Sequence, residues 1–260
     1  MQTRLFSPAY GAVFTDDNNA GLVATDTQKN TVYVVAKRSS ARTPEGYGVD
    51  LCKQLLHEYP VLSAVEVEVT ESVWERFTSG GGVAHEHGFI KRPEKALAQV
   101  RLTRDAPDRP EVVSGLTGLT VLKTTQSGFE NYLQDKYTLL PETSERCMAT
   151  EMSAEWRYDG GGDGPPDYAA TRATVLEKLT TGFFGPPKGG VFSPSLQSTI
   201  YDAGCLVLSA APRVTSISID TPNIHMIPFH QLKALGDTFD NDVYVATSDP
   251  AGTIHCTVTR

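Results

Sequence analysis

Alternating apolar and polar residues mark the sheet-forming segments of this chain. In Val65–Val69 every second residue is a valine and the residues between them are glutamates, which is typical of a strand with one buried face. We expect this strand to continue to Phe77, to turn at the three glycines Gly80–Gly82 and to return towards Ile90. A second alternating segment, Met148–Tyr158, has apolar residues on one face and mostly charged residues on the other.

Other segments predict further strands and several helices. Thr43, Pro44 and Glu45 form a typical helix start, and apolar residues then recur at helical spacing until Pro60. Asp167 is suited to cap a helix from Tyr168 to about Leu179, and Ser193 or Ser195 to cap one that reaches Leu208. A short helical stretch is expected at 129–133. Further strands are expected at 31–37, 95–103, 112–123, 214–220 and 243–258.

The order of these elements is strands, helix and strands, followed by strands, helices and strands. This order favours an α+β fold with antiparallel sheets and helices on one face, in two similar halves. We place the boundary between residues 111 and 112, so that the predicted units are 1–111 and 112–260.

Composition and charge exclude several classes of function. The chain has 260 residues and a formal net charge of −8 at pH 7, so it offers no basic surface for a nucleic acid. It has no apolar run long enough to cross a membrane, no signal-peptide core and no peroxisomal Ser-Lys-Leu tail. The four cysteines are scattered without a CxxC pair, as in a reduced cytosolic protein. We therefore expect a cytoplasmic protein that binds a small molecule or another protein.

One long stretch, Gly115–Tyr158, is too specific to be explained by fold alone. It resembles the core signature of the uricase (urate oxidase) family. The matching motifs are Leu119–Lys123, Phe129, Asp135–Thr138, Glu142–Arg146 and, outside this stretch, Ala24–Thr31 and Pro222–His225. The resemblance implies two tandem tunnelling-fold (T-fold) units in each chain and a homotetramer with active sites at subunit interfaces. It also implies oxidation of urate by O2 to 5-hydroxyisourate and hydrogen peroxide, with no metal or organic cofactor.

Urate is a flat anion, and three residues suit its recognition. Arg146 offers a planar cationic fork, Gln197 an amide with both donor and acceptor, and Phe129 a stacking ring. Taken singly, they would also fit a surface ion pair, a solvated helix position and a core ring. The family motifs around them favour a substrate site, and Leu196, next to Gln197, belongs to it by the same resemblance.

The resemblance assigns roles to four further positions, three in the chemical step and one in substrate binding. Asn223 is the expected holder of O2, and His225, two residues on, shares its strand face and is suited to a proton relay. Thr25 is expected to handle protons, and the backbone N–H of Asp26 to bind the purine of a neighbouring subunit. Without the resemblance, Thr25 and Asp26 would be read as a polar turn before a strand. Ile224 stands where the family usually has lysine.

One family motif is missing. In uricases a lysine in an N-terminal Tyr-Gly-Lys strand pairs with the threonine as the catalytic base, but the nearest match here is Tyr10-Gly11-Ala12. The first T-fold unit is therefore expected to be N-terminally truncated, which would leave an open sheet edge. Two hypotheses follow: a urate oxidase, or a catalytically weak purine-binding or subunit-interaction protein.

A metal site is a weaker alternative. His85 and His87 would lie on one strand face, which suits a pair of zinc ligands, and related T-fold enzymes that act on pterins use a zinc-binding histidine cluster. No third ligand stands at a suitable spacing. The glycine-rich segments at 80–82 and 160–164 lack the Lys-Ser/Thr of a phosphate loop and indicate turns.

Overall fold

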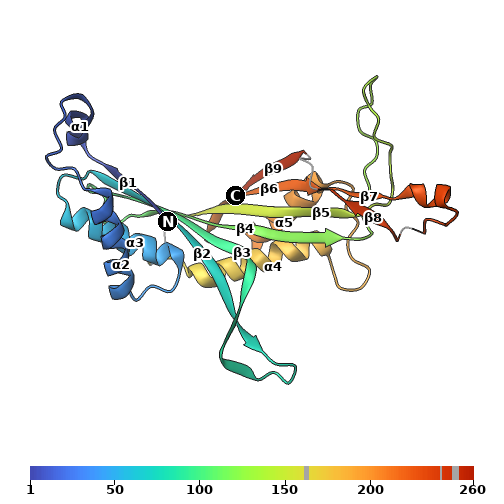
Figure 1. The fold of residues 1–260 in the computed structure, drawn as a ribbon, viewed down its shortest axis with the longest axis horizontal. Helices are drawn as coiled ribbons and strands as arrows, with labels where there is room; N and C mark the ends of the chain where they lie inside the picture. The colour runs from blue at the N-terminus through green and yellow to red at the C-terminus, as the bar shows by residue number, and fades with distance from the viewer. Residues whose placement is uncertain (161–163, 241, 248–251) are drawn as a thin grey trace. The chain divides into compact units, whose positions relative to one another are not determined.

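The computed structural model describes residues 1–160, 164–240, 242–247 and 252–260. Contacts within the chain divide them into two compact units, and Figure 1 shows their elements. Unit 1 consists of Met1–Leu116 and Glu155–Arg172, and unit 2 of Thr117–Ala154 and Ala173–Arg260. Three elements therefore contribute residues to both units, namely β4 (Glu111–Lys123), β5 (Met148–Tyr158) and α4 (Tyr168–Phe184). The predicted boundary between residues 111 and 112 stays a prediction.

The sheet of unit 1 is formed by β1 (Gln2–Phe6), β2 (Ala64–Thr78) and β3 (Ala84–Thr103), which pair antiparallel, and β4 follows β3. Val67 pairs with Thr3 on one side and with Val100 on the other. The predicted alternation in β2 is confirmed, since Val65, Val67 and Val69 are buried while the glutamates between them are partly exposed. The turn at Gly80–Gly82 is confirmed too, because the Gly82 N–H donates to the Ser79 carbonyl at 2.8 Å.

Helix α3 (Pro44–Glu58) packs on β2 and β3 and completes the core of unit 1. It begins as predicted, with the Thr43 side chain accepting a hydrogen bond from the Gly46 N–H at 3.2 Å. Leu51 and Leu55 are buried against β2 and β3, and burial of each contributes about 1.5–3 kcal/mol. Gly48 permits this close approach, because a Cβ there would lie 2.7 Å from Val100 Cγ2.

The predicted strand at 31–37 is wrong, since Thr25–Arg38 forms helix α2. Its valines and tyrosine are good strand formers, but Val35 is buried in the core cluster that contains α3, and the Tyr47 hydroxyl donates to the Val32 carbonyl at 2.8 Å. Packing of α2 on α3 therefore outweighs the local preference. A 3-10 turn, η1 (Pro8–Tyr10), and the short helix α1 (Gly11–Thr15) precede α2.

The strands predicted around Ile90 and at 95–103 form the single long strand β3. The β2–β3 register shifts between the pairs Ser72↔Lys95 and Trp74↔Lys91. Pro93 lies inside this shift, where a residue without an N–H is tolerated because the ladder of hydrogen bonds is already interrupted. The bulge explains why a proline does not end the strand.

In unit 2, β5 is followed in the sheet by β6 (Val214–Ile224) and β9 (Thr253–Thr259). Helix α5 (Leu196–Ala210) packs on β6 and β9. Ser195 caps α5, and Asp167 caps α4, which continues to Phe184.

The predicted strand at 243–258 is divided into two strands. The first, β8 (Tyr244–Ala246), pairs with β7 (Met226–Pro228), and the second is β9; residues 248–251 lie outside the described part. A 3-10 helix, η2 (His230–Leu235), lies between β7 and β8.

The helical stretch predicted at 129–133 is wrong. Gln126 and Asn131 have φ values of 61° and 60°, a left-handed conformation that a right-handed helix excludes. Phe129 instead forms an isolated antiparallel bridge with Thr143. The predicted turn at 160–164 contains residues 161–163, which lie outside the described residues.

The two units repeat one another in detail. Thr43 and Ser195 cap helices of 15 residues, and the C-cap residues Tyr59 and Ala211 have nearly the same φ and ψ, −119° and 87° against −116° and 84°. In these helices and the strands that follow them, equivalent positions differ by 152 in number, whereas the two arginines described next differ by 156. After each helix an arginine closes its last turn: Arg104 donates to the carbonyls of Leu56, Tyr59 and Leu62, and Arg260 to those of Leu208, Ala211 and Val214. The repetition supports the proposal that the chain has two units of one fold.

The α+β class with antiparallel strands and helices packed on the sheet is confirmed. Among the described residues, no helix combines the length and the apolar character needed to cross a membrane.

Candidate functional site

Arg146 of unit 2 is a cation with a buried side-chain nitrogen. Its backbone N–H donates to the Ser127 carbonyl at 2.7 Å, which fixes it just before β5. The Nε atom is buried and has no hydrogen-bond partner among the described residues, and desolvation lowers the pKa of the guanidinium. A buried donor without a partner is costly. Among the described residues, this N–H group is therefore a donor that still has a hydrogen bond to give.

Phe129 lies beside Arg146, as expected from the sequence. The guanidinium carbon of Arg146 is 5.3 Å from the centre of the Phe129 ring. Backbone bonds to Thr143 hold Phe129 on both sides, at 2.7 Å and 3.1 Å. Tyr132, which the sequence did not single out, stacks on the Phe129 ring with a centroid distance of 4.7 Å and an angle of 11°. The structure thus brings together a cationic fork and an aromatic ring of fixed orientation.

A buried lysine stabilises the segment that leads to Phe129. Lys123 is only 8% exposed, and its ammonium group donates to the Val191 carbonyl and to the Ser193 hydroxyl, both at 2.8 Å. The backbone of Ser193 in turn bonds to Gln126 and Gly128. From the sequence, Lys123 was only the last residue of a predicted strand and of the family motif Leu119–Lys123, with no role of its own. Its position two residues after the buried Val121 indicated an inward-facing lysine and was the signal that could have found it.

Gly128 allows the segment before Phe129 to pack closely against the backbone of residues 143–144 and the ring of Phe192. A Cβ at this position would lie 3.0 Å from the Thr143 carbonyl oxygen and 3.1 Å from Phe192 Cζ. Any side chain would therefore separate the segment that carries Phe129 from the segment that leads to Arg146.

The predicted pair Leu196 and Gln197 opens helix α5. The hydroxyl of Ser195 accepts a hydrogen bond from the Ser198 N–H at 3.1 Å and so caps the helix. Leu196 is buried in the core, whereas Gln197 is exposed. Gln197 is therefore the member of the pair whose side chain is free to meet a ligand.

Asn223 and His225 lie at the end of β6 and just after it. Asn223 is partly buried, and its N–H donates to the Gly252 carbonyl at 3.2 Å. His225 is exposed, and its carbonyl accepts from the Thr247 N–H at 3.1 Å. Because α5 and β6 are joined by a short connection, the start of α5 and the end of β6 lie at the same end of the helix–strand pair. Gln197 and Asn223 therefore belong to one region of unit 2.

Thr25 and Asp26 belong to unit 1, where they form the first turn of α2 rather than a turn before a strand. Both are exposed, and the Asp26 carboxylate accepts a hydrogen bond from the Asn30 side chain at 2.9 Å. Helix α2 starts without a side-chain cap, so the first N–H groups of the helix remain available as donors. Their expected role across a subunit interface stays a prediction.

The two histidines of the alternative metal site lie in β3 near the hairpin turn. The His85 ring accepts a hydrogen bond from the His87 N–H at 3.1 Å, and both residues are exposed. Within the described residues, no group of three or more His, Cys, Asp or Glu side chains is placed to hold a metal ion. The structure thus adds no third ligand to this pair.

Comparison with known proteins shows the family of this chain. The sequence model of the family described as Uricase matches residues 8–98 and 112–255. The chain belongs to the uricase family. It is 39% identical to Uricase-2 isozyme 1 of Glycine max over 264 residues, which cover 98% of this chain and 84% of the relative. It is 40% identical to the Uricase of Arabidopsis thaliana over 253 residues, which cover 94% of this chain and 81% of the relative.

Solved uricase structures also share the fold. The uricase of Arthrobacter globiformis superimposes with a TM-score of 0.87 at 32% identity and covers 100% of this chain and 84% of the solved one. The predicted T-fold architecture is therefore confirmed at the level of fold. All the predicted site residues of the two units lie within the segments that match the uricase family.

Proposed function

We propose that this uricase-family protein binds urate and catalyses its oxidation by O2 to 5-hydroxyisourate and hydrogen peroxide, without a metal or an organic cofactor. The observation that carries the proposal is the buried Nε of Arg146, which has no partner within the described part of the chain and lies beside the Phe129 ring. A flat anion that stacks on Phe129 would supply the missing acceptor, and the low local dielectric would strengthen this charge-assisted bond.

The other site residues would complete recognition and chemistry. Gln197 would pair with the edge of the purine, with Leu196 anchoring the start of α5, and Asn223 would hold O2 above the ring. Two electrons pass from urate to O2, which takes up two protons and becomes hydrogen peroxide, and water adds its hydroxyl to the oxidised purine. Thr25 and His225 would move these protons.

The N-terminal end of α2 supports a site shared between subunits. Its uncapped N–H groups, that of Asp26 among them, would donate to the purine bound by a neighbouring chain. The proposal therefore includes a homotetramer, in which Thr25 and Asp26 of one chain complete the site of another. We also propose that the protein works in the cytoplasm.

Urate consumption and oxygen uptake by the purified chain, followed together, test this function. We expect loss of urate absorbance with one O2 consumed for each urate, and hydrogen peroxide as a product. The reaction should continue at the same rate after treatment with a metal chelator. Failure to bind urate under anaerobic conditions would refute the assignment of Arg146 and Phe129.

The second candidate function is purine binding with weak turnover or none. The environment of Lys123 favours it, because this is the lysine of the described residues whose pKa is lowered, through burial. Its ammonium group is already bonded to Val191 and Ser193, so it is not free to act as the base. Urate binding without oxygen uptake would identify this second function, whereas full turnover would exclude it.

A further inference from the structure

The internal repeat gives two residues of the candidate site direct counterparts in unit 1. Gln197 is the second residue of α5, and the second residue of α3 is Glu45. In the strands that follow, the buried Ile217 and Ile219 correspond to the buried Val65 and Val67. The same offset of 152 matches Asn223 to Glu71. Where unit 2 has two neutral amides, unit 1 therefore has two carboxylates.

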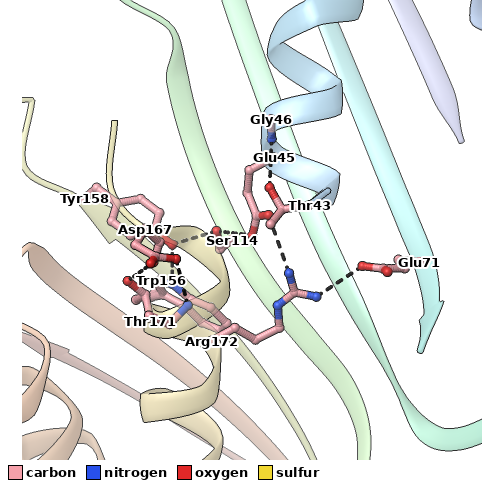
Figure 2. A network of polar contacts seen from close by, with 11 residues as sticks. Thr43, Glu45, Gly46, Glu71, Ser114, Trp156, Tyr158, Asp167, Thr171 and Arg172 are labelled. Carbon is pink, nitrogen blue, oxygen red and sulfur yellow. Dashed lines mark hydrogen bonds and ion pairs between the residues drawn. The ribbon is translucent and has the colours of Figure 1, made fainter. Parts of the chain in front are cut away.

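A guanidinium group joins these two carboxylates in unit 1. Arg172 Nη1 donates to Glu71 Oε2 at 3.2 Å, and Arg172 Nη2 lies 3.8 Å from Glu45 Oε2 (Figure 2). Arg172 thus lies between the start of a helix and the strand that follows it. In unit 2 the equivalent position lies between Gln197 and Asn223, the residues that we propose to hold urate and O2.

The surroundings of Glu45 show that it needs a cationic partner. Glu45 is only 1% exposed, and its Oε2 has no hydrogen-bond partner among the described residues. Its Oε1 accepts a bond of 2.6 Å from the Ser114 hydroxyl. A buried carboxylate with one bare oxygen is strongly unfavourable unless a positive charge lies close to it.

A chain of hydrogen bonds fixes which oxygen of Glu45 is left for the cation (Figure 2). The Ser114 hydroxyl donates its hydrogen to Glu45, so the Tyr158 hydroxyl must be the donor in its 2.8 Å contact with Ser114 Oγ. The Trp156 ring N–H in turn donates to the Tyr158 hydroxyl at 2.8 Å. Burial raises the pKa of Tyr158 to about 12, so this hydroxyl keeps its proton. All the donors of the chain thus point towards Oε1, and Oε2 is left for the cation.

We propose that unit 1 contains a second binding position, equivalent to the candidate site of unit 2, that accepts a planar cation of the guanidinium or amidinium class and is occupied by the side chain of Arg172. The inference rests on the proposed function in so far as Gln197 and Asn223 mark the ligand position of unit 2. Its consequence is that each chain binds one urate, because two carboxylates already paired with a cation leave no position for a second anion.

Chemical rescue tests the proposal. Arg172→Ala should lower the melting temperature by roughly 5–10 °C, because Glu45 becomes a buried charge without a partner. Added guanidinium chloride at a few tens of millimolar should raise the melting temperature of this variant by several degrees. It should leave the wild-type value unchanged or lower it. Sodium chloride at the same ionic strength is the control and should not reproduce the effect.

Two further variants keep the test decisive. Arg172→Ala combined with Glu45→Gln removes the buried charge, so it should be more stable than Arg172→Ala alone and should not respond to guanidinium. Arg172→Lys keeps the charge without the planar fork and should be less stable than the wild type. An Arg172→Lys variant as stable as the wild type, or an Arg172→Ala variant that guanidinium does not stabilise more than sodium chloride does, would overturn the proposal.

Urate binding separates this proposal from the proposed function. A stoichiometry of one urate per chain supports a filled second position, and two urates per chain in the wild type would contradict it. Absence of urate binding would refute the proposed function, while rescue of Arg172→Ala by guanidinium would still establish the cation position in unit 1.

Discussion

Replacement of Lys123 by methionine tests how the candidate site is held in place. The methionine side chain has a similar length but no donor, so it removes the bonds to the Val191 carbonyl and the Ser193 hydroxyl. Hydrogen bonds to a charged group contribute about 1.5–3 kcal/mol each. The desolvation that lowers the pKa of Lys123 opposes this gain. We therefore expect the free energy of unfolding to fall by about 2–3 kcal/mol.

The same substitution should weaken urate binding. Ser193 holds the backbone of Gln126 and Gly128, so loss of its contact with Lys123 loosens the segment that carries Phe129. A displacement of the stacking ring by a fraction of an ångström is expected to raise the KM for urate roughly tenfold, with a smaller change in kcat.

Urea unfolding and urate kinetics on the same preparation measure both effects. Lys53→Met, which changes an exposed lysine on α3, is the matched control and should behave like the wild type. If Lys123→Met unfolds at the wild-type urea concentration and keeps the wild-type KM, then Lys123 does not position the site.

Three other predictions concern single residues. Arg146→Gln should weaken anaerobic urate binding by roughly 100-fold in a titration, because it removes a desolvated cation that is ready to pair with an anion; unchanged affinity would remove Arg146 from the site. Ser195→Ala should lower the free energy of unfolding in urea by about 1 kcal/mol through loss of the α5 cap, and a neutral result would mean that the cap is dispensable. Burial raises the pKa of the Cys52 thiol to about 12 from 9.0, so above pH 9 the unfolded chain loses a proton that the native state keeps. The free energy of unfolding should then fall with rising pH by about 1.4 kcal/mol per pH unit. Cys52→Ala should show a flatter dependence between about pH 9 and 10, and the same slope in both proteins would mean that the thiol also ionises in the native state.

Local sequence signals were sufficient where packing agreed with them. The alternation in β2 and the cap residues Thr43, Asp167 and Ser195 act through neighbouring residues, so the sequence alone identified them. Helix α2 was missed because its valines favour a strand and only burial against α3 stabilises the helix. The loop around Phe129 was missed because Gln126 and Asn131 adopt left-handed conformations, which are uncommon for residues other than glycine.

In the candidate site too, the sequence identified residues that share a motif and missed contacts between residues that are distant in sequence. Motif resemblance selected Phe129 and Arg146 together, and the structure brings them into contact. A motif does not reveal that Arg146 Nε lacks a partner among the described residues, or that Tyr132 stacks on Phe129, because both depend on how the chain folds back between these residues. The support from Lys123 likewise depends on Val191 and Ser193, which are distant in sequence.

The two units are interleaved along the chain, and this affects how the protein can be made. Unit 1 needs Arg172 to neutralise Glu45, yet β4 and β5, which also supply unit 2, are synthesised before Arg172 leaves the ribosome. Unit 1 can therefore be completed only after residues 117–154 of unit 2 have been synthesised, whereas the first of two consecutive domains usually folds before the second appears. For the same reason a cut at the predicted boundary between residues 111 and 112 would separate Glu45 from Arg172, and expression of residues 1–111 alone would leave Glu45 without its cation.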